Sequence, residues 1–108
     1  MHRDYLLYLD DILEAIRRIR LYTENMDREA FVADQRTMDA VIRNLEIIGE
    51  ASAKLPEHIR EITPDIEWRK IIAMRNILAH EYFGVNADII WDVIQNKLNV
   101  LARACEEI

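Results

Sequence analysis

Apolar residues recur at intervals of three and four through most of this chain, which is the spacing of one face of an α-helix. Between about Asp4 and Tyr22 they form a continuous stripe: Leu6, Leu9, Ile12, Leu13, Ile16 and Ile19. Only 2 Gly and 2 Pro occur, so long helices meet few interruptions. No run keeps the two-residue period of a strand for longer than chance allows. The sequence therefore predicts an all-α fold.

Cap and breaker residues divide this pattern into four main helices. We expect them near residues 4–22, 35–54, 68–82 and 87–106, with short helical turns at 27–32 and 57–61. The expected start and stop signals are Asp27 and Asn86 as N-caps, Thr63 as the cap before Pro64 in the first turn, and Gly84 as a C-terminal break. The prediction is one domain, residues 1–108, folded as an up-and-down four- to five-helix bundle.

Two features of the apolar pattern predict contacts beyond a simple bundle. Gly49 lies on the stripe of the second long helix, where glycine costs helix propensity. It is expected to let a neighbouring helix come close, or to leave room for a ligand or partner. The last helix is apolar over more than a third of its girth, and Tyr5, Tyr8 and Leu21 lie outside the main stripe of the first. This surplus predicts a homodimer.

The charge balance excludes broad electrostatic binding to nucleic acid. The net charge is −6, so any contact with RNA needs a local positive site. Arg17, Arg18 and Arg20 cluster on the first helix, and arginine suits phosphate, although such charges are often simply solvated. The single cysteine, Cys105, excludes an internal disulfide. No run reaches the length of a membrane span and the N-terminus shows no signal-peptide core, so the expected location is cytoplasmic.

One charged residue breaks an apolar helix face. That face consists of Trp68, Ile71, Ile72, Arg75, Leu78, Ala79 and Tyr82. A guanidinium costs several kcal/mol to bury alone. Arg75 must therefore be paired, or must open onto an interface or pocket.

Arg75 and His80 together could cleave RNA without a metal ion. His80 could activate the ribose 2′-hydroxyl or protonate the leaving oxygen, and Arg75 could bind the phosphate. The two residues lie roughly 140° apart on an ideal helix, so a shared cleft at a two-fold axis suits them better than a monomer pocket. Alternatively, they could close a structural network with Glu46 or Glu50, and Asn76 could orient the imidazole in either case. No metal-binding spacing, glycine-rich phosphate loop or other cofactor motif is present, so no cofactor is expected.

The residues around this pair resemble a known family. Arg75-Asn76 followed by His80-Glu81-Tyr82 matches the Arg-x4-His-x-Tyr motif of the HEPN superfamily, and in particular the HepT-like proteins. The segments at 44–51, 64–68 and 91–94 also resemble the family, so the resemblance covers nearly the whole chain.

This resemblance implies a fold and a function. It implies a HEPN-like helical bundle that dimerises, with the motif in a cleft at the interface. It implies a metal-independent endoribonuclease toxin in which Arg75 and His80 are catalytic and Asn76 supports them. It also implies a nucleotidyltransferase antitoxin that can transfer AMP to Tyr82. The alternative is a non-catalytic HEPN subunit that binds a nucleotide or a protein in a nucleotidyltransferase complex.

Overall fold

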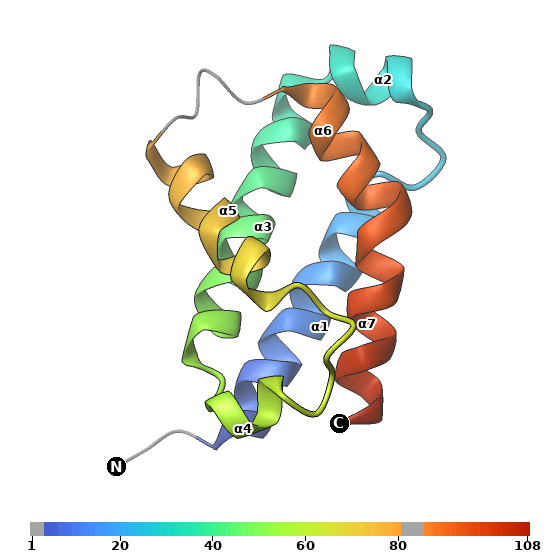
Figure 1. Cartoon of the computed structure of the whole chain (residues 1–108). Helices are drawn as coiled ribbons and strands as arrows, with labels where there is room; N and C mark the ends of the chain where they lie inside the picture. Colours follow the sequence, from blue (N-terminus) through green and yellow to red (C-terminus); the bar gives the residue numbers. More distant parts are fainter. Residues whose placement is uncertain (1–3, 81–85) are drawn as a thin grey trace.

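The chain folds into a bundle of helices, shown in Figure 1. The computed structural model describes residues 4–80 and 86–108, without the side chain of His80. The helices are α1 (Tyr5–Tyr22), α2 (Arg28–Ala33), α3 (Gln35–Lys54), α4 (Glu57–Arg60), α5 (Trp68–His80), α6 (Ala87–Asp92), the π-helical segment η2 (Val93–Lys97) and α7 (Leu98–Glu107). No strand occurs in the described ranges, so the all-α prediction is confirmed.

The long helix α3 is the centre of the bundle. It packs against α1 on one side and α5 on the other, while α7 packs against α1. The residues predicted for its inner face are all buried: Met38, Val41, Ile42, Leu45, Ile48, Gly49 and Ser52. Short α2 closes one end, where the Phe31 ring lies 5.3 Å from that of Trp91, between ring centroids. The arrangement leaves α5 packed closely against α3 alone among the long helices.

Side-chain caps begin most of these helices. The Asp27 carboxylate accepts a hydrogen bond from the Ala30 amide at 2.8 Å, and the Asn86 side chain accepts one from the Asp88 amide at 2.8 Å. Both predicted N-caps are therefore confirmed. Such oxygens satisfy amides that have no partner in the first turn of a helix.

The predicted cap of α5 is wrong. The helix begins at Trp68, where the apolar pattern placed it, so Thr63 is not its cap and Pro64 is not in its first turn. The Thr63 hydroxyl instead accepts a hydrogen bond from the Trp68 indole nitrogen at 3.0 Å. That bond ties the linker to the buried Trp68 ring. The predicted break at Gly84 lies outside the described residues.

The sequence pattern predicts one continuous last helix, and this prediction is wrong. A π-helical turn, η2, separates α6 from α7 and changes the helical phase between them. Ile90, Ile94 and Leu98, each four residues apart, are all buried, whereas an ideal α-helix would rotate them away from one face by about 40° per step. Two of the residues that make the apolar face of the last helix wide, Ile89 and Val100, are exposed in the single chain.

Exposed apolar side chains occur on several helices. Leu6, expected in the α1 stripe, is exposed, and so are Leu7 and Leu21 on the same helix.

Cys105 is buried, and burial raises the pKa of its thiol to about 12. None of the described helices combines the length and the apolar character that crossing a bilayer requires.

Candidate functional site

The last turns of α5 carry the residues predicted to be functional. Arg75 and Asn76 lie in the middle of this helix, and the backbone of His80 forms its last residue. Arg75 is half-buried and Asn76 is exposed. Tyr82, the predicted acceptor of AMP, lies outside the described residues. The structure therefore places Arg75, Asn76 and the His80 backbone on one helix and leaves the positions of the imidazole and the tyrosine open.

Gly49 brings α3 and α5 together at Arg75. A Cβ atom added to Gly49 would lie 2.6 Å from the Arg75 Cβ and 3.2 Å from the Ile71 carbonyl oxygen. Both atoms belong to or adjoin the α5 backbone, so they cannot move without moving the helix. The prediction that Gly49 allows a close helix approach is confirmed. The root of the Arg75 side chain consequently lies directly on α3.

The apolar face predicted around Arg75 is only partly buried. Trp68 and Leu78 are buried, but Ile71 and Ile72 are half-buried and Ala79 is exposed. The inclusion of Ala79 in a buried seam was therefore wrong for the single chain, because among the described helices only α3 makes an extensive contact with α5. Since an arginine stem can pack against apolar groups while its charged end reaches water, Arg75 suits this border position.

Among the described side chains, neither Glu46 nor Glu50 pairs with the Arg75 guanidinium, and the part of the alternative network that involves His80 stays untested. Glu46 instead pairs with Arg43 on its own helix, at 3.4 Å between the Arg43 Nη1 and the carboxylate. Glu50 is half-buried, next to Gly49 in the chain. Within residues 4–80 and 86–108, no hydrogen bond or ion pair is formed by the Arg75 guanidinium. In the part of the chain that the structure describes, its donors remain available to a ligand or to a second chain.

The solvent side of α5 carries two exposed apolar residues. Ile77 is 52% exposed, and Ala73 is exposed one turn earlier. Residues four apart lie on one helix face, so these two side chains form a small apolar strip. On an ideal helix the strip lies roughly 160° around the axis from Arg75, so it is on a different face from the guanidinium.

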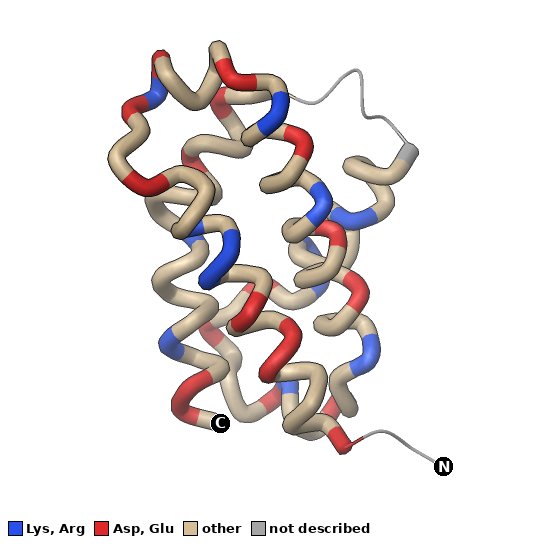
Figure 2. The backbone as a smooth tube through the Cα atoms, turned by 180° about the vertical axis from the view of Figure 1, so that it is seen from behind, with Lys and Arg blue, Asp and Glu red and all other residues tan. Residues whose placement is uncertain are grey.

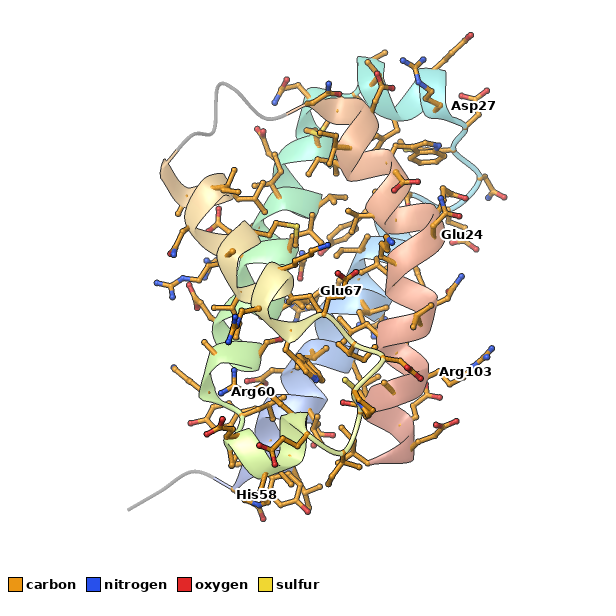
Figure 3. The ribbon with its side chains drawn as sticks, in the orientation of Figure 1. Glu24, Asp27, His58, Arg60, Glu67 and Arg103 are labelled. Carbon is orange, nitrogen blue, oxygen red and sulfur yellow. The ribbon has the colours of Figure 1, made fainter. Side chains whose placement is uncertain are left out.

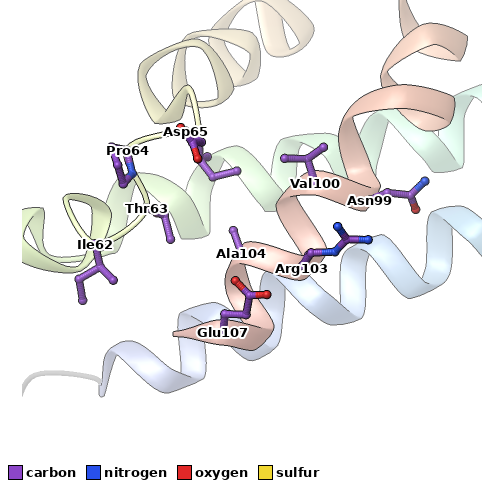
Figure 4. Close-up of a pocket in the computed structure, with 10 residues that line it drawn as sticks. Ile62, Thr63, Pro64, Asp65, Asn99, Val100, Arg103, Ala104 and Glu107 are labelled. Carbon is purple, nitrogen blue, oxygen red and sulfur yellow. The ribbon is translucent and has the colours of Figure 1, made fainter.

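Two hollows lie beside α7. One, of about 310 Å³, lies between α7 and the linker at residues 62–66, and Figure 4 shows Arg103, Asn99 and Glu107 on its α7 side. The other, of about 290 Å³, lies between α5 and η2, with Met74 and Val93 among its lining residues. In the part of the chain that the structure describes, no group of three or more His, Cys, Asp and Glu side chains could hold a metal ion.

Two buried polar residues on α3 were not singled out as site candidates. Asn44 is buried and donates to the Ala40 carbonyl oxygen at 2.9 Å, but its side-chain oxygen has no partner within the described ranges. The Ser52 hydroxyl is fully buried and also lacks one there. Helical spacing predicted that Ser52 faces inward, yet spacing alone does not show whether a polar group will find a partner.

Comparison with known proteins identifies a family. The family model described as "Ribonuclease HepT-like" matches residues 12–108. A Thermococcus cleftensis protein named "Probable ribonuclease HepT" is 40% identical over 108 residues, covering 100% of this chain and 98% of the relative. A Methanocaldococcus jannaschii protein named "Putative RNase" is 41% identical over 106 residues, covering 98% and 88%. No solved structure shows significant similarity to the chain.

A methyl group at Gly49 should separate the two helices that meet at Arg75. We expect Gly49→Ala to lower the free energy of unfolding by about 1 to 3 kcal/mol, because overpacking costs that much. The measurement is urea denaturation at fixed protein concentration.

The control for this prediction is Ala53→Gly, at an exposed position of the same helix. It measures the helix propensity of alanine over glycine, which is worth about 1 kcal/mol. If propensity alone mattered at Gly49, alanine would stabilise the protein by about that amount. A gain in stability would therefore contradict the close approach.

Proposed function

The chain belongs to the HepT-like ribonuclease family, and we propose that it is an endoribonuclease toxin that cuts RNA without a metal ion. The proposed catalytic residues are Arg75 and His80, with Asn76 in a supporting role. The observation that carries this proposal is the Arg75 guanidinium, held at the edge of the α3–α5 contact with no partner among the described residues. A cation in that state can bind a phosphate group.

The proposed reaction is attack by the RNA on its own phosphate. An imidazole removes the proton from the ribose 2′-hydroxyl, and the 2′-oxygen then forms a bond to phosphorus. The bond from phosphorus to the 5′-oxygen breaks, and a protonated imidazole returns a proton to that leaving oxygen. The Arg75 guanidinium stabilises the charge on the phosphate oxygens. The products are a 2′,3′-cyclic phosphate and a 5′-hydroxyl end.

Two observations support a site shared by two subunits. Arg75 and His80 point about 140° apart on an ideal helix, so one chain does not direct both at one phosphate without help. The apolar strip of Ile77 and Ala73 on another face of α5 is exposed in the single chain. In the proposed homodimer a partner chain covers this strip, and each Arg75 lies near the other chain's His80.

Loss of either proposed catalytic residue should abolish cleavage. We expect His80→Ala and Arg75→Ala each to reduce the rate of RNA cleavage at least on the order of 100-fold, the usual value of general acid–base or charge stabilisation. The rate is measured with purified protein and RNA in excess chelator.

Matched controls are His58→Ala and Arg69→Ala, which remove exposed side chains of the same types from α4 and α5. Both should retain full cleavage. Cleavage that survives loss of His80 and of Arg75 would overturn the assignment, and cleavage lost on chelation alone would overturn its metal independence.

A shared site makes a specific prediction for mixed dimers. Arg75→Ala and His80→Ala proteins are each inactive, but a mixed dimer regains one pairing of an intact Arg75 with the other chain's intact His80. Co-refolding equal amounts should therefore restore about a quarter of wild-type activity, because half of the dimers are mixed and each has one of two sites. No recovery, or a protein that sediments only as a monomer, would contradict the shared site.

We propose further that a nucleotidyltransferase antitoxin inhibits this site by modifying Tyr82. The tyrosine oxygen would attack the α-phosphorus of ATP and release pyrophosphate, which leaves AMP on the residue two positions after His80. The added group would bring a phosphate to the Arg75 guanidinium and occupy the space that RNA needs. The Arg75 donors, which have no partner among the described residues, support this route to inhibition.

Modification should depend on the motif tyrosine alone. After co-expression with its nucleotidyltransferase partner, the protein should gain the mass of one adenylyl group per chain. Tyr82→Phe should abolish this gain, and Tyr22→Phe, which changes an exposed tyrosine on α1, should not. Intact-mass spectrometry decides, and a gain that persists in Tyr82→Phe would exclude this acceptor.

A further inference from the structure

A second group of cations lies on the surface formed by α1 and α7. We define the arginine cluster as Arg17, Arg18 and Arg20 of α1 with Arg103 of α7, all of them exposed. The two helices pack side by side, and Figure 2 shows basic segments on both. The cluster is separate from the α3–α5 contact that holds Arg75. The sequence grouped the three α1 residues, but Arg103, more than 80 positions later, joins them only in the fold.

Hydrogen bonds hold three of the cluster's arginines in two groups. Arg17 donates from Nε and Nη2 to the Glu14 carboxylate at 2.9 and 2.7 Å, and Arg18 donates from Nε to the same carboxylate at 3.2 Å. Arg20, one turn after Arg17, donates to the Asn99 side-chain oxygen at 2.5 Å across to α7. One carboxylate thus orients two guanidiniums without occupying all their donors.

Arg103 completes the cluster from α7. It lies four residues after Asn99, so the two side chains share a helix face. Figure 4 shows both projecting from the same side of α7, and Figure 3 shows the Arg103 side chain extending outward from the bundle. No hydrogen bond or ion pair to Arg103 exists within the described ranges. The nearest acids along the chain, Glu106 and Glu107, follow it at the end of α7.

The charge of the cluster is opposite to that of the whole protein. Four arginines and Glu14 sum to +3, so the remainder of a chain with net charge −6 carries −9. The Arg17 guanidinium holds the pKa of Glu14 down at about 2, so this carboxylate stays ionised and remains bound to its arginines. A polyanion approaching the protein therefore meets attraction here and repulsion over much of the remaining surface.

We propose that the arginine cluster binds the phosphate backbone of the RNA substrate outside the cleavage site. The inference rests on the proposed function for its choice of RNA, and on the cluster itself for the chemistry. Planar guanidiniums with free N–H groups match phosphate oxygens in pairs. The acids at the borders, Asp10 and Asp11 earlier in α1 and Glu106 and Glu107 in α7, limit the contact to a few phosphates. Binding at the cluster is independent of base sequence and depends on salt.

The experiment measures binding of a labelled single-stranded RNA of mixed sequence by fluorescence anisotropy, in the His80→Ala background so that the RNA stays intact. Arg17→Gln with Arg103→Gln should lower the slope of log affinity against log salt by about 1.4, or about 0.7 for each lost phosphate contact. At about 0.1 M salt this corresponds to a loss of affinity on the order of tenfold. Arg36→Gln with Lys54→Gln removes two exposed cations from α3 and should leave the slope unchanged.

A substitution that is expected to strengthen RNA binding separates an effect on binding from a general effect on folding. Glu14→Gln removes the carboxylate that occupies Arg17 and Arg18, so RNA should bind several-fold more tightly. Glu57→Gln, which removes one exposed acid from α4, gives the same change in net charge and should have little effect.

The outcomes distinguish this inference from the proposed function. If wild-type protein cleaves RNA and the Arg17 and Arg103 double variant binds normally, the cluster is not an RNA site and the proposed function stands. If binding falls as expected but wild-type protein cleaves nothing, the cluster binds RNA and the proposed catalysis is wrong. An equal loss of RNA affinity in the Arg36→Gln with Lys54→Gln control overturns the inference. So does the absence of detectable RNA binding by every variant. A cluster that instead binds an acidic protein gives one of these negative results.

Discussion

The backbone contact between α3 and α5 at Gly49 is the constraint on which the rest of the structure depends. A hydrogen in place of a side chain lets the two helices meet, and the root of Arg75 lies in the space that a Cβ would fill. Arg75 is thereby held at the edge of the core, where its stem can pack and its charge can remain hydrated. Burying that charge without a partner would cost several kcal/mol, and full exposure would leave its direction undefined.

Local chemistry made the helices predictable from the sequence, and tertiary contacts caused the errors. The bounds of α3 agree with the prediction because Lys54 lies two residues before Pro56 and the apolar spacing is regular up to that point. Asp27 and Asn86 cap helices through bonds to residues two or three positions away, so sequence shows them directly. The exposure of Ala79 could not be predicted, since it depends on which other helix covers that end of α5.

The candidate site was predictable in its chemistry but not in its assembly. Arg75 was identifiable because a permanent charge interrupts an apolar stripe, and its lack of a partner within the described chain agrees with an open site. Glu46, one of two possible structural partners for Arg75 in the sequence, pairs instead with Arg43, three residues earlier on the same helix. A site divided between two chains leaves no trace in the spacing of one. Arg103 likewise joins Arg20 only through the packing of α7 on α1.

The wide turn at Val93–Lys97 has a consequence for the whole of α7, which follows it. Each residue of an α-helix is rotated by about 100° from the one before it, and a π turn has a smaller rotation per residue. The turn therefore changes the direction in which the side chains of α7 point relative to those of α6. These five residues therefore determine which side chains of α7 face the core and which face solvent. Loss of one residue there would swing Arg103 around the axis of α7 and bring Cys105 out of the core, although neither lies in the turn itself.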